Sequence, residues 1–226
     1  MIERLDACIW RWTAPHPEWR PRSPWVRECA CFALSAEGAL ALVDPLAPAE
    51  QPERLWSALD ELIEQSAPER LAVLTTIHYH VRSAAAVARR YRGRLPVSVH
   101  GHASVRAALG RGIRFEPIEP GAELPAGARA HAIGKPRRRE MPLWFPSLRA
   151  LAFGDAVVGV EGELRVWEQL DGGKRARWYR ERFLPTLAPL GELSPRHVLV
   201  THGPPAVGDG KRKLARALAE PPWWHR

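Results

Sequence analysis

Two histidines separated by one residue, His78 and His80, are the clearest chemical feature of the sequence. They come shortly after residues 71–74, a short apolar run of the kind that forms a buried strand. Where the backbone turns after such a strand, two imidazoles with this spacing can converge on one metal ion. The pair alone does not define a site, so its partners must be sought elsewhere in the chain.

Asp155 and His202 are the groups most suited to complete such a site, because each also follows an apolar, strand-like run closely. One edge of a sheet could therefore receive all four side chains. Imidazoles and a carboxylate suit zinc, manganese or iron. An open coordination position on such an ion would lower the pKa of bound water towards neutrality, which supports hydrolysis.

The elements needed to position these residues alternate between strands and helices. The patterning predicts strands at residues 7–10, 29–34, 39–43, 71–74, 95–99, 128–133, 143–145, 150–153, 156–158, 164–167 and 197–200. It predicts helices from residue 52 onward and at 84–91, 103–109, 174–184 and 211–218. In open α/β sheets, ligands bind at the carboxyl ends of strands, where His78, His80, Asp155 and His202 are expected.

Length and composition predict one globular domain over residues 1–226, with 46% hydrophobic and 26% charged residues. The first twelve residues include Glu3, Arg4 and Asp6, which interrupt the apolar stretch that a secretory signal needs. No run approaches membrane-spanning length. We therefore expect a cytoplasmic protein without a membrane partner, and the sequence does not predict its oligomeric state.

Cys29 and Cys31 would point to the same face of a strand, and with Cys8 they are expected to be reduced core residues. The net charge of +8 could attract nucleic acid, but the basic residues are scattered rather than gathered in one stripe. A small anionic ligand is the expected partner, and nucleic acid is not. Trp223 and the tryptophan after it are expected to dock back onto the domain or onto a second subunit.

Four segments carry a resemblance to the metallo-β-lactamase superfamily, which includes hydrolases of thioesters and lactones and some ribonucleases. They are residues 42–45 (LVDP), 76–83 (TIHYHVRS), 151–155 (LAFGD) and 200–203 (VTHG). The resemblance implies an α/β fold, a four-layered αββα sandwich with a metal site along one edge of the sheets. It also implies that His78 and His80 bind a first metal ion, that Asp155 bridges, and that His202 binds a second.

The sequence departs from the family motif H-x-H-x-D-H at two positions. Arg82 stands where the motif has aspartate and Ser83 where it has histidine. A permanently charged guanidinium opposes a second cation nearby, so a dinuclear site is not expected. We treat Arg82 and Ser83 as residues that line the site or contact the substrate.

The third histidine of the family's first metal site is also missing, because Lys135 stands in its place. His131 and Glu140 are the nearby groups that could substitute as ligands, and Glu140 could also line the site. What remains is a mononuclear site made by His78, His80 and Asp155, with His202 joining if the geometry relaxes. The expected cofactor is one divalent ion, zinc or else manganese or iron, or none.

The same residues can also form a metal-free polar cluster in which Arg82 replaces a cation and pairs with Asp155. The basic run 135–139 is then a solvated loop, or it grips a phosphate or carboxylate of a ligand. His16, His100, His102, His197 and His225 lie in no comparable constellation, and we assign them no role.

Two functions follow from the sequence. The first is a hydrolase with an incomplete, at most mononuclear metal site that acts on a small anionic ester, thioester or lactone. The alternative is a non-catalytic member of the fold that binds an anionic ligand or a protein partner. Nucleic-acid processing has the weakest support, because no basic stripe is present.

Overall fold

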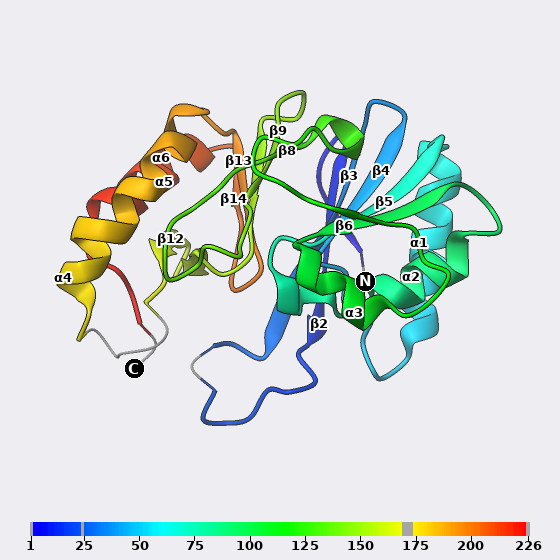
Figure 1. Cartoon of the computed structure of the whole chain (residues 1–226), viewed down its shortest axis with the longest axis horizontal. Coiled ribbons are helices and arrows are strands. Elements are labelled where there is room, and N and C mark those ends of the chain that lie inside the picture. Colours follow the sequence, from blue (N-terminus) through cyan, green and yellow to red (C-terminus); the bar gives the residue numbers. More distant parts are fainter. Residues whose placement is uncertain (1, 24, 169–173, 225–226) are drawn as a thin grey trace.

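Two β-sheets packed face to face form the centre of the protein, and helices cover the outer side of each sheet (Figure 1). The computed structural model describes residues 2–23, 25–168 and 174–224. None of the helices within these ranges is long and apolar enough to cross a membrane.

The first sheet has seven strands that follow one another in chain order. They are β1 (Glu3–Asp6), β2 (Ile9–Pro15), β3 (Glu28–Ala36), β4 (Ala39–Val43), β5 (Arg70–Leu74), β6 (Val97–Gly101) and β7 (Phe115–Pro117). Pairing is antiparallel from β1 to β4 and parallel from β4 to β7. The early antiparallel strands are joined by tight turns and, between β2 and β3, by a loop of residues 16–27. Each of the later parallel pairs is joined by a crossover that contains a helix, as parallel pairing requires a long connection.

The second sheet has five strands in the order β14-β13-β10-β9-β8. They are β8 (Arg129–Ala130), β9 (Leu143–Phe145), β10 (Ala150–Phe153), β13 (His197–Val200) and β14 (Ala206–Val207). Only β10 and β13 pair in parallel. A separate hairpin, β11 (Val157–Val160) and β12 (Glu163–Val166), follows β10.

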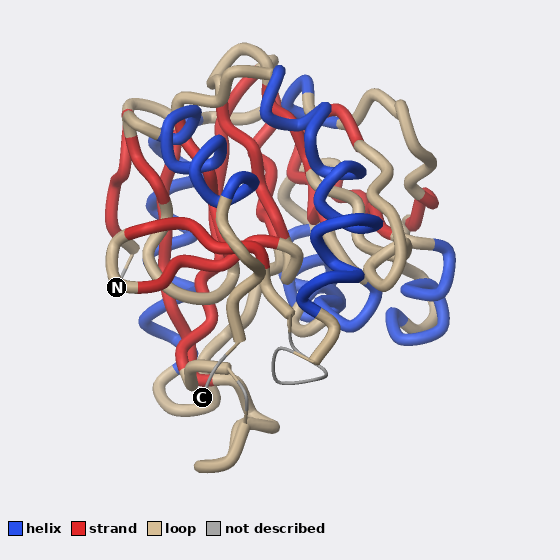
Figure 2. Tube along the Cα trace, turned by 90° about the vertical axis from the view of Figure 1, so that its left-hand side faces the viewer, coloured by secondary structure: helices blue, strands red, loops and turns tan. Residues whose placement is uncertain are grey.

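Helices α1 (Pro52–Ser66), α2 (Ala84–Tyr91) and α3 (Arg106–Leu109) lie on the side of the first sheet. Helices α4 (Ala176–Trp178), α5 (Leu184–Glu192) and α6 (Gly210–Ala219) lie on the side of the second, and Figure 2 shows them in front of the strands. Short 3₁₀ segments occupy His78–Val81, Ala103–Val105 and Pro125–Gly127, and a π-helical turn, Tyr179–Phe183, joins α4 to α5.

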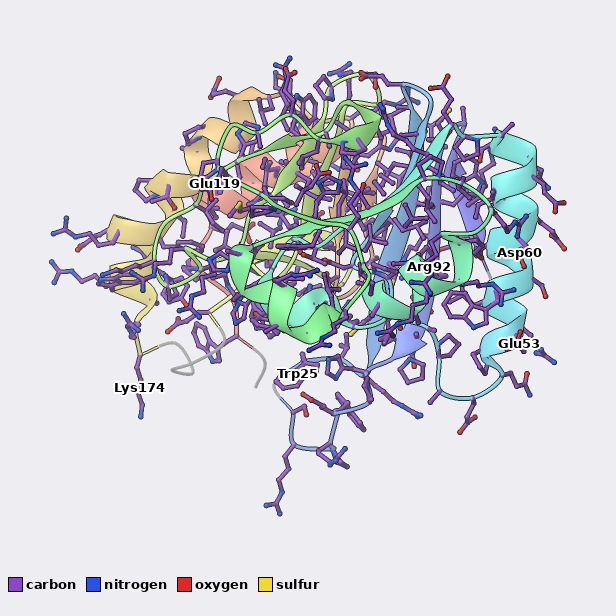
Figure 3. All side chains as sticks on the ribbon, turned by 45° about the vertical axis from the view of Figure 1, so that its right-hand side comes forward. Trp25, Glu53, Asp60, Arg92, Glu119 and Lys174 are labelled. Carbon is purple, nitrogen blue, oxygen red and sulfur yellow. The ribbon has the colours of Figure 1, made fainter. Side chains whose placement is uncertain are left out.

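Three layers of apolar contact hold the four layers of secondary structure together. On the α1 side, Leu55, Leu59 and Leu62 are buried as predicted. Glu53, near the start of the same helix (Figure 3), is exposed, whereas Asp60 is partly buried and pairs with Arg90 and Arg94. Between the sheets, large residues of β3 and β9 pack together with small residues of β4 and β10, and the third layer lies under α5 and α6. The predicted four-layered αββα sandwich is confirmed.

Three predicted elements need correction. The strand expected at 128–133 is confined to Arg129–Ala130. The strand expected at 7–10 spans a turn, because residues 7 and 8 connect β1 to β2. The helix expected at 174–184 begins at Ala176 and continues through the π turn and α5 to Glu192. Pro185 directly follows the π turn, where the hydrogen bonding already departs from the regular α-helical pattern, and the helix continues past it and past Pro189.

Other expectations are confirmed, apart from the placement of Cys8 in the core. Cys29 and Cys31 are buried in the same layer, on the α1 side of the first sheet, whereas Cys8, in the turn between β1 and β2, is only partly buried and lies outside the core. The tail docks back onto the domain, since Trp223 forms backbone hydrogen bonds with Val166 and Glu168 at 2.8 and 2.7 Å. His225 lies outside the described residues.

Candidate functional site

The candidate site lies where the carboxyl ends of four strands meet, two from each sheet. Asp44 follows β4 and His80 follows β5, which pair in parallel in the first sheet. Asp155 follows β10 and His202 follows β13, the parallel pair of the second sheet. A backbone hydrogen bond of 2.7 Å from Ala30 to Thr201 joins the two sheets nearby.

Asp44 orients the imidazole of His80. Its carboxylate is buried and accepts hydrogen bonds from the Thr76 backbone N–H at 2.8 Å and from Nδ1 of His80 at 2.9 Å. The Nδ1 proton is therefore fixed on that side, which leaves Nε2 facing Asp155 at 3.6 Å from Oδ1. Burial, together with the charge of Arg82, lowers the pKa of His80, against the opposing charges of Asp44 and Asp155.

Asp155 is the centre of the cluster. Oδ1 faces Nε2 of His80 and, at 3.4 Å, Nε2 of His202. Oδ2 accepts a hydrogen bond from the Tyr79 hydroxyl and lies 3.5 Å from Nη1 of Arg137. Burial opposes ionisation, but the two histidines and Arg137 outweigh it and hold the pKa of Asp155 well below its ordinary value. The carboxylate is therefore permanently charged.

His202 supplies one of the positive charges beside Asp155. Burial disfavours its protonation, but the pairing with the charge of Asp155 and the neighbouring Cys29 prevail and raise the pKa of His202 to about 9. At neutral pH the ring is therefore an imidazolium.

Arg137 supplies the other charge, and its position corrects a prediction. The guanidinium is 7% exposed, pairs with Asp155, and lies over the ring of Trp167 at 5.3 Å from the ring centroid. The pairing expected of Arg82 is therefore made by Arg137. Arg82 instead donates from Nη1 to the backbone carbonyl of Asp44 at 3.3 Å.

A hollow of about 690 Å³ opens above this cluster, and we call it the first hollow. Tyr79, His80, Arg82, Asp155 and His202 line its inner wall. The loop between β2 and β3 borders the outer side of the first hollow, and Figure 3 labels Trp25 on this loop. Nε and Nη2 of Arg82 are buried and make no hydrogen bond with any described residue.

Ser83 also lines the first hollow, as the prediction required. Its hydroxyl accepts a hydrogen bond from the Ala47 backbone at 2.9 Å, and its own N–H donates to the Pro45 carbonyl at 3.0 Å. These bonds tie the loop after β4 to the start of α2.

His78 does not join the other three predicted ligands. It lines a different hollow, beside Arg138 and Arg139. The reason is the 3₁₀ segment His78–Val81, in which three residues make a turn, so that side chains two residues apart point in directions roughly 120° apart. The spacing that suggested convergence therefore sends His78 and His80 in different directions.

Glu140 has a structural role that its sequence position did not reveal. It is fully buried and accepts backbone hydrogen bonds from Gly154, Asp155 and Ala156 at 3.0, 3.1 and 3.1 Å. It therefore fixes the loop that presents Asp155. His131, the other substitute ligand considered, follows β8 and lines neither hollow.

Comparisons with known proteins agree with this architecture. No protein-family model matches the sequence, and no curated protein does either. Among solved structures, a metallo-β-lactamase from Pontibacter korlensis is 14% identical with a TM-score of 0.64, over 97% of this chain and 99% of that one. The chain has the metallo-β-lactamase fold.

Two further structures with the metallo-β-lactamase fold are similar. A metallo-β-lactamase family protein from Thermus thermophilus is 16% identical with a TM-score of 0.57, over 96% of this chain and 80% of that one. A β-lactamase domain protein from Burkholderia ambifaria is also 16% identical, with a TM-score of 0.63 over 96% and 75%. At this identity the likeness establishes the fold alone.

The metal ions implied by the metallo-β-lactamase fold do not fit the side chains as they are arranged. Oδ2 of Asp155 is engaged by Tyr79 and Arg137, whereas Oδ1 is buried and has no hydrogen-bond partner among the described residues. Arg137 brings its positive charge to the carboxylate that would hold the ion, and Arg82 occupies the motif's aspartate position. Within the described ranges, no group of three His, Cys, Asp or Glu side chains is arranged to hold a metal ion. The set His78, His80, Asp155 and His202 stays a prediction, of which the structure brings the last three together.

Three residues of this site were missed by sequence reasoning. Asp44 carried a usable signal, since it ends an apolar strand as Asp155 does. Tyr79 lies between the two histidines, and nothing in the sequence indicates that its hydroxyl reaches Asp155. Arg137 stands in a run of three arginines, and nothing in the sequence tells which of them turns inward.

Proposed function

We propose that this metallo-β-lactamase-fold protein binds a small anionic ligand in the first hollow without a metal ion. The observation that carries the proposal is the guanidinium of Arg82 on the wall of that hollow, with two nitrogens that no described group satisfies. A carboxylate or phosphate accepts hydrogen bonds from a guanidinium in a planar, two-pronged arrangement. The ligand would therefore supply the hydrogen-bond acceptors that Nε and Nη2 of Arg82 lack.

The charges around the hollow support this reading. Asp155 is compensated by Arg137 and His202, and Asp44 is engaged by His80 and the Thr76 backbone. Arg82 forms no ion pair within the described part of the chain, so its charge is available to a ligand. A hollow of about 690 Å³ is also within the size range of small-molecule sites.

Thermal denaturation in EDTA, with and without a panel of small carboxylates and organic phosphates, tests the proposal. A ligand present at about 100 times its Kd stabilises by about 2.7 kcal/mol, which raises Tm by roughly 5–10 °C for a chain of this size. Arg82→Gln should abolish the shift, and Arg54→Gln, an exposed residue on α1, should retain it.

A hydrolase that uses one metal ion is the second candidate, with a small anionic ester, thioester or lactone as substrate. It is favoured by one observation, that Nε2 of His80 and Nε2 of His202 both lie within 3.6 Å of the same oxygen of Asp155. Elemental analysis of protein purified without a histidine tag separates the candidates. Near-stoichiometric metal that is lost in His80→Ala would overturn the metal-free proposal and favour the hydrolase.

A further inference from the structure

A second hollow of about 490 Å³ lies on the other side of Tyr79. It is formed between the segment that follows β5 and the basic loop that precedes β9. His78, Arg138 and Arg139 are among the residues that line it. Tyr79 borders both hollows. Its hydroxyl is already bound to Asp155, so this ring divides the two spaces without supplying a donor to the second.

The second hollow carries positive charge that the described residues do not neutralise. Arg138 and Arg139 are exposed, and neither forms an ion pair with a described carboxylate. Elsewhere on the surface, arginines do find partners, as Arg90 and Arg94 do with Asp60 at 2.8 and 2.6 Å. Two adjacent guanidiniums at a concave site create a local field that attracts anions.

His78 adds a directional polar group to this field. Its Nδ1 is buried and has no hydrogen-bond partner within the described residues. A buried polar atom left without a partner is costly, so such an atom beside a hollow points to a ligand that would satisfy it. The burial of His78 and the charge of Arg139 lower its pKa, so the neutral ring can donate through Nδ1 or Nε2 according to its tautomer.

We infer that the second hollow is a binding site for a phosphate or carboxylate group, held by Arg138, Arg139 and His78. The guanidiniums would each donate to the anion's oxygens, and the imidazole would donate one further hydrogen bond from the buried side. This site is separate from the one proposed around Arg82, because Tyr79 stands between them.

Nuclear magnetic resonance titration of the full chain with inorganic phosphate, and separately with acetate, tests the inference. The titrations are run in EDTA at constant ionic strength, and backbone amide signals report on each hollow. We expect saturable shifts at residues 78–79 and 137–139. The double variant Arg138→Gln/Arg139→Gln should bind at this site at least roughly tenfold more weakly, which corresponds to about 1.4 kcal/mol.

The matched control is Arg54→Gln/Arg70→Gln. It removes the same charge from two exposed arginines that line neither hollow, and Arg70 lies at the opposite end of β5 from His78. The control should change the Kd less than twofold. An equal loss in both double variants would mean general charge attraction and would overturn the inference.

Two more variants complete the test. Arg82→Gln should leave the shifts at the second hollow intact, so that failure of the first proposal is seen separately from failure of this one. His78→Phe, which keeps an aromatic ring but no donor, should weaken binding at the second hollow. Shifts confined to residues around Arg82, or none with either anion, would overturn the second site.

Discussion

Replacement of Glu140 tests whether the Asp155 loop depends on one buried carboxylate. In Glu140→Ala, three buried N–H groups, those of Gly154, Asp155 and Ala156, lose their acceptor. An unsatisfied buried donor costs about 2 kcal/mol, so the gross loss is about 6 kcal/mol. This is large against the 5–15 kcal/mol that stabilises an ordinary domain.

Part of that destabilisation is offset, because Glu140→Ala no longer buries a charged carboxylate. Burial raises the pKa of Glu140 from 4.5 to about 7. At about 1.4 kcal/mol for each pH unit, the charged carboxylate costs about 3 kcal/mol above pH 7. The net destabilisation expected for Glu140→Ala at pH 8 is therefore about 3 kcal/mol, before the cavity left by the side chain is counted.

Glu140→Gln separates the acceptor from the charge. One amide oxygen can still accept from Gly154 and Ala156, the two N–H groups that Oε1 serves, and the buried charge is gone. We therefore expect Glu140→Gln to lie within about 1 kcal/mol of the wild type. Urea denaturation at pH 8 measures both variants, and Glu119→Ala, at an exposed position, serves as the control.

Equal stability of the alanine and glutamine variants would refute this reasoning, because the two differ chiefly in the retained acceptor. A loss below about 1 kcal/mol in Glu140→Ala would do the same, since three orphaned donors cannot cost so little.

Two more predictions concern the histidine and glycine after β13. The folded pKa of His202, about 9, lies above its ordinary 6.5, so the stability gained from its pair with Asp155 is full below pH 6.5 and is lost as pH rises through 9. The advantage of the wild type over His202→Gln should fall by roughly 3 kcal/mol across that window in urea denaturation, and a constant difference would disprove the pairing. Gly203→Ala should destabilise by about 3 kcal/mol, because its Cβ would lie 1.9 Å from a backbone oxygen. Gly162→Ala, with the same φ of +82° and open space around the Cβ, isolates that contact, and equal thermal stability of the two variants would contradict the explanation.

The sequence by itself determined the layers and the ends of the important strands. Apolar runs at residues 39–43, 71–74, 150–153 and 197–200 are buried on both faces, so their composition specifies central strands whatever surrounds them. Polar residues directly after such runs must lie at the sheet edge, which is why Asp155 and His202 were found. Arg82 and Ser83 were also expected at the site, and both line the first hollow.

Only the tertiary structure decided which side chains face one another. The side chains of His78 and His80 point in different directions because of a rotation within one 3₁₀ turn. Arg137 is buried and Arg138 is exposed because the loop that carries them turns one side chain inward and the other outward. Local patterns do not encode such directions, because they depend on what packs against the loop. In this protein a buried arginine reaches Asp155 where a cation would otherwise be expected, because the ring of Trp167 and the charge of Asp155 together stabilise the guanidinium there.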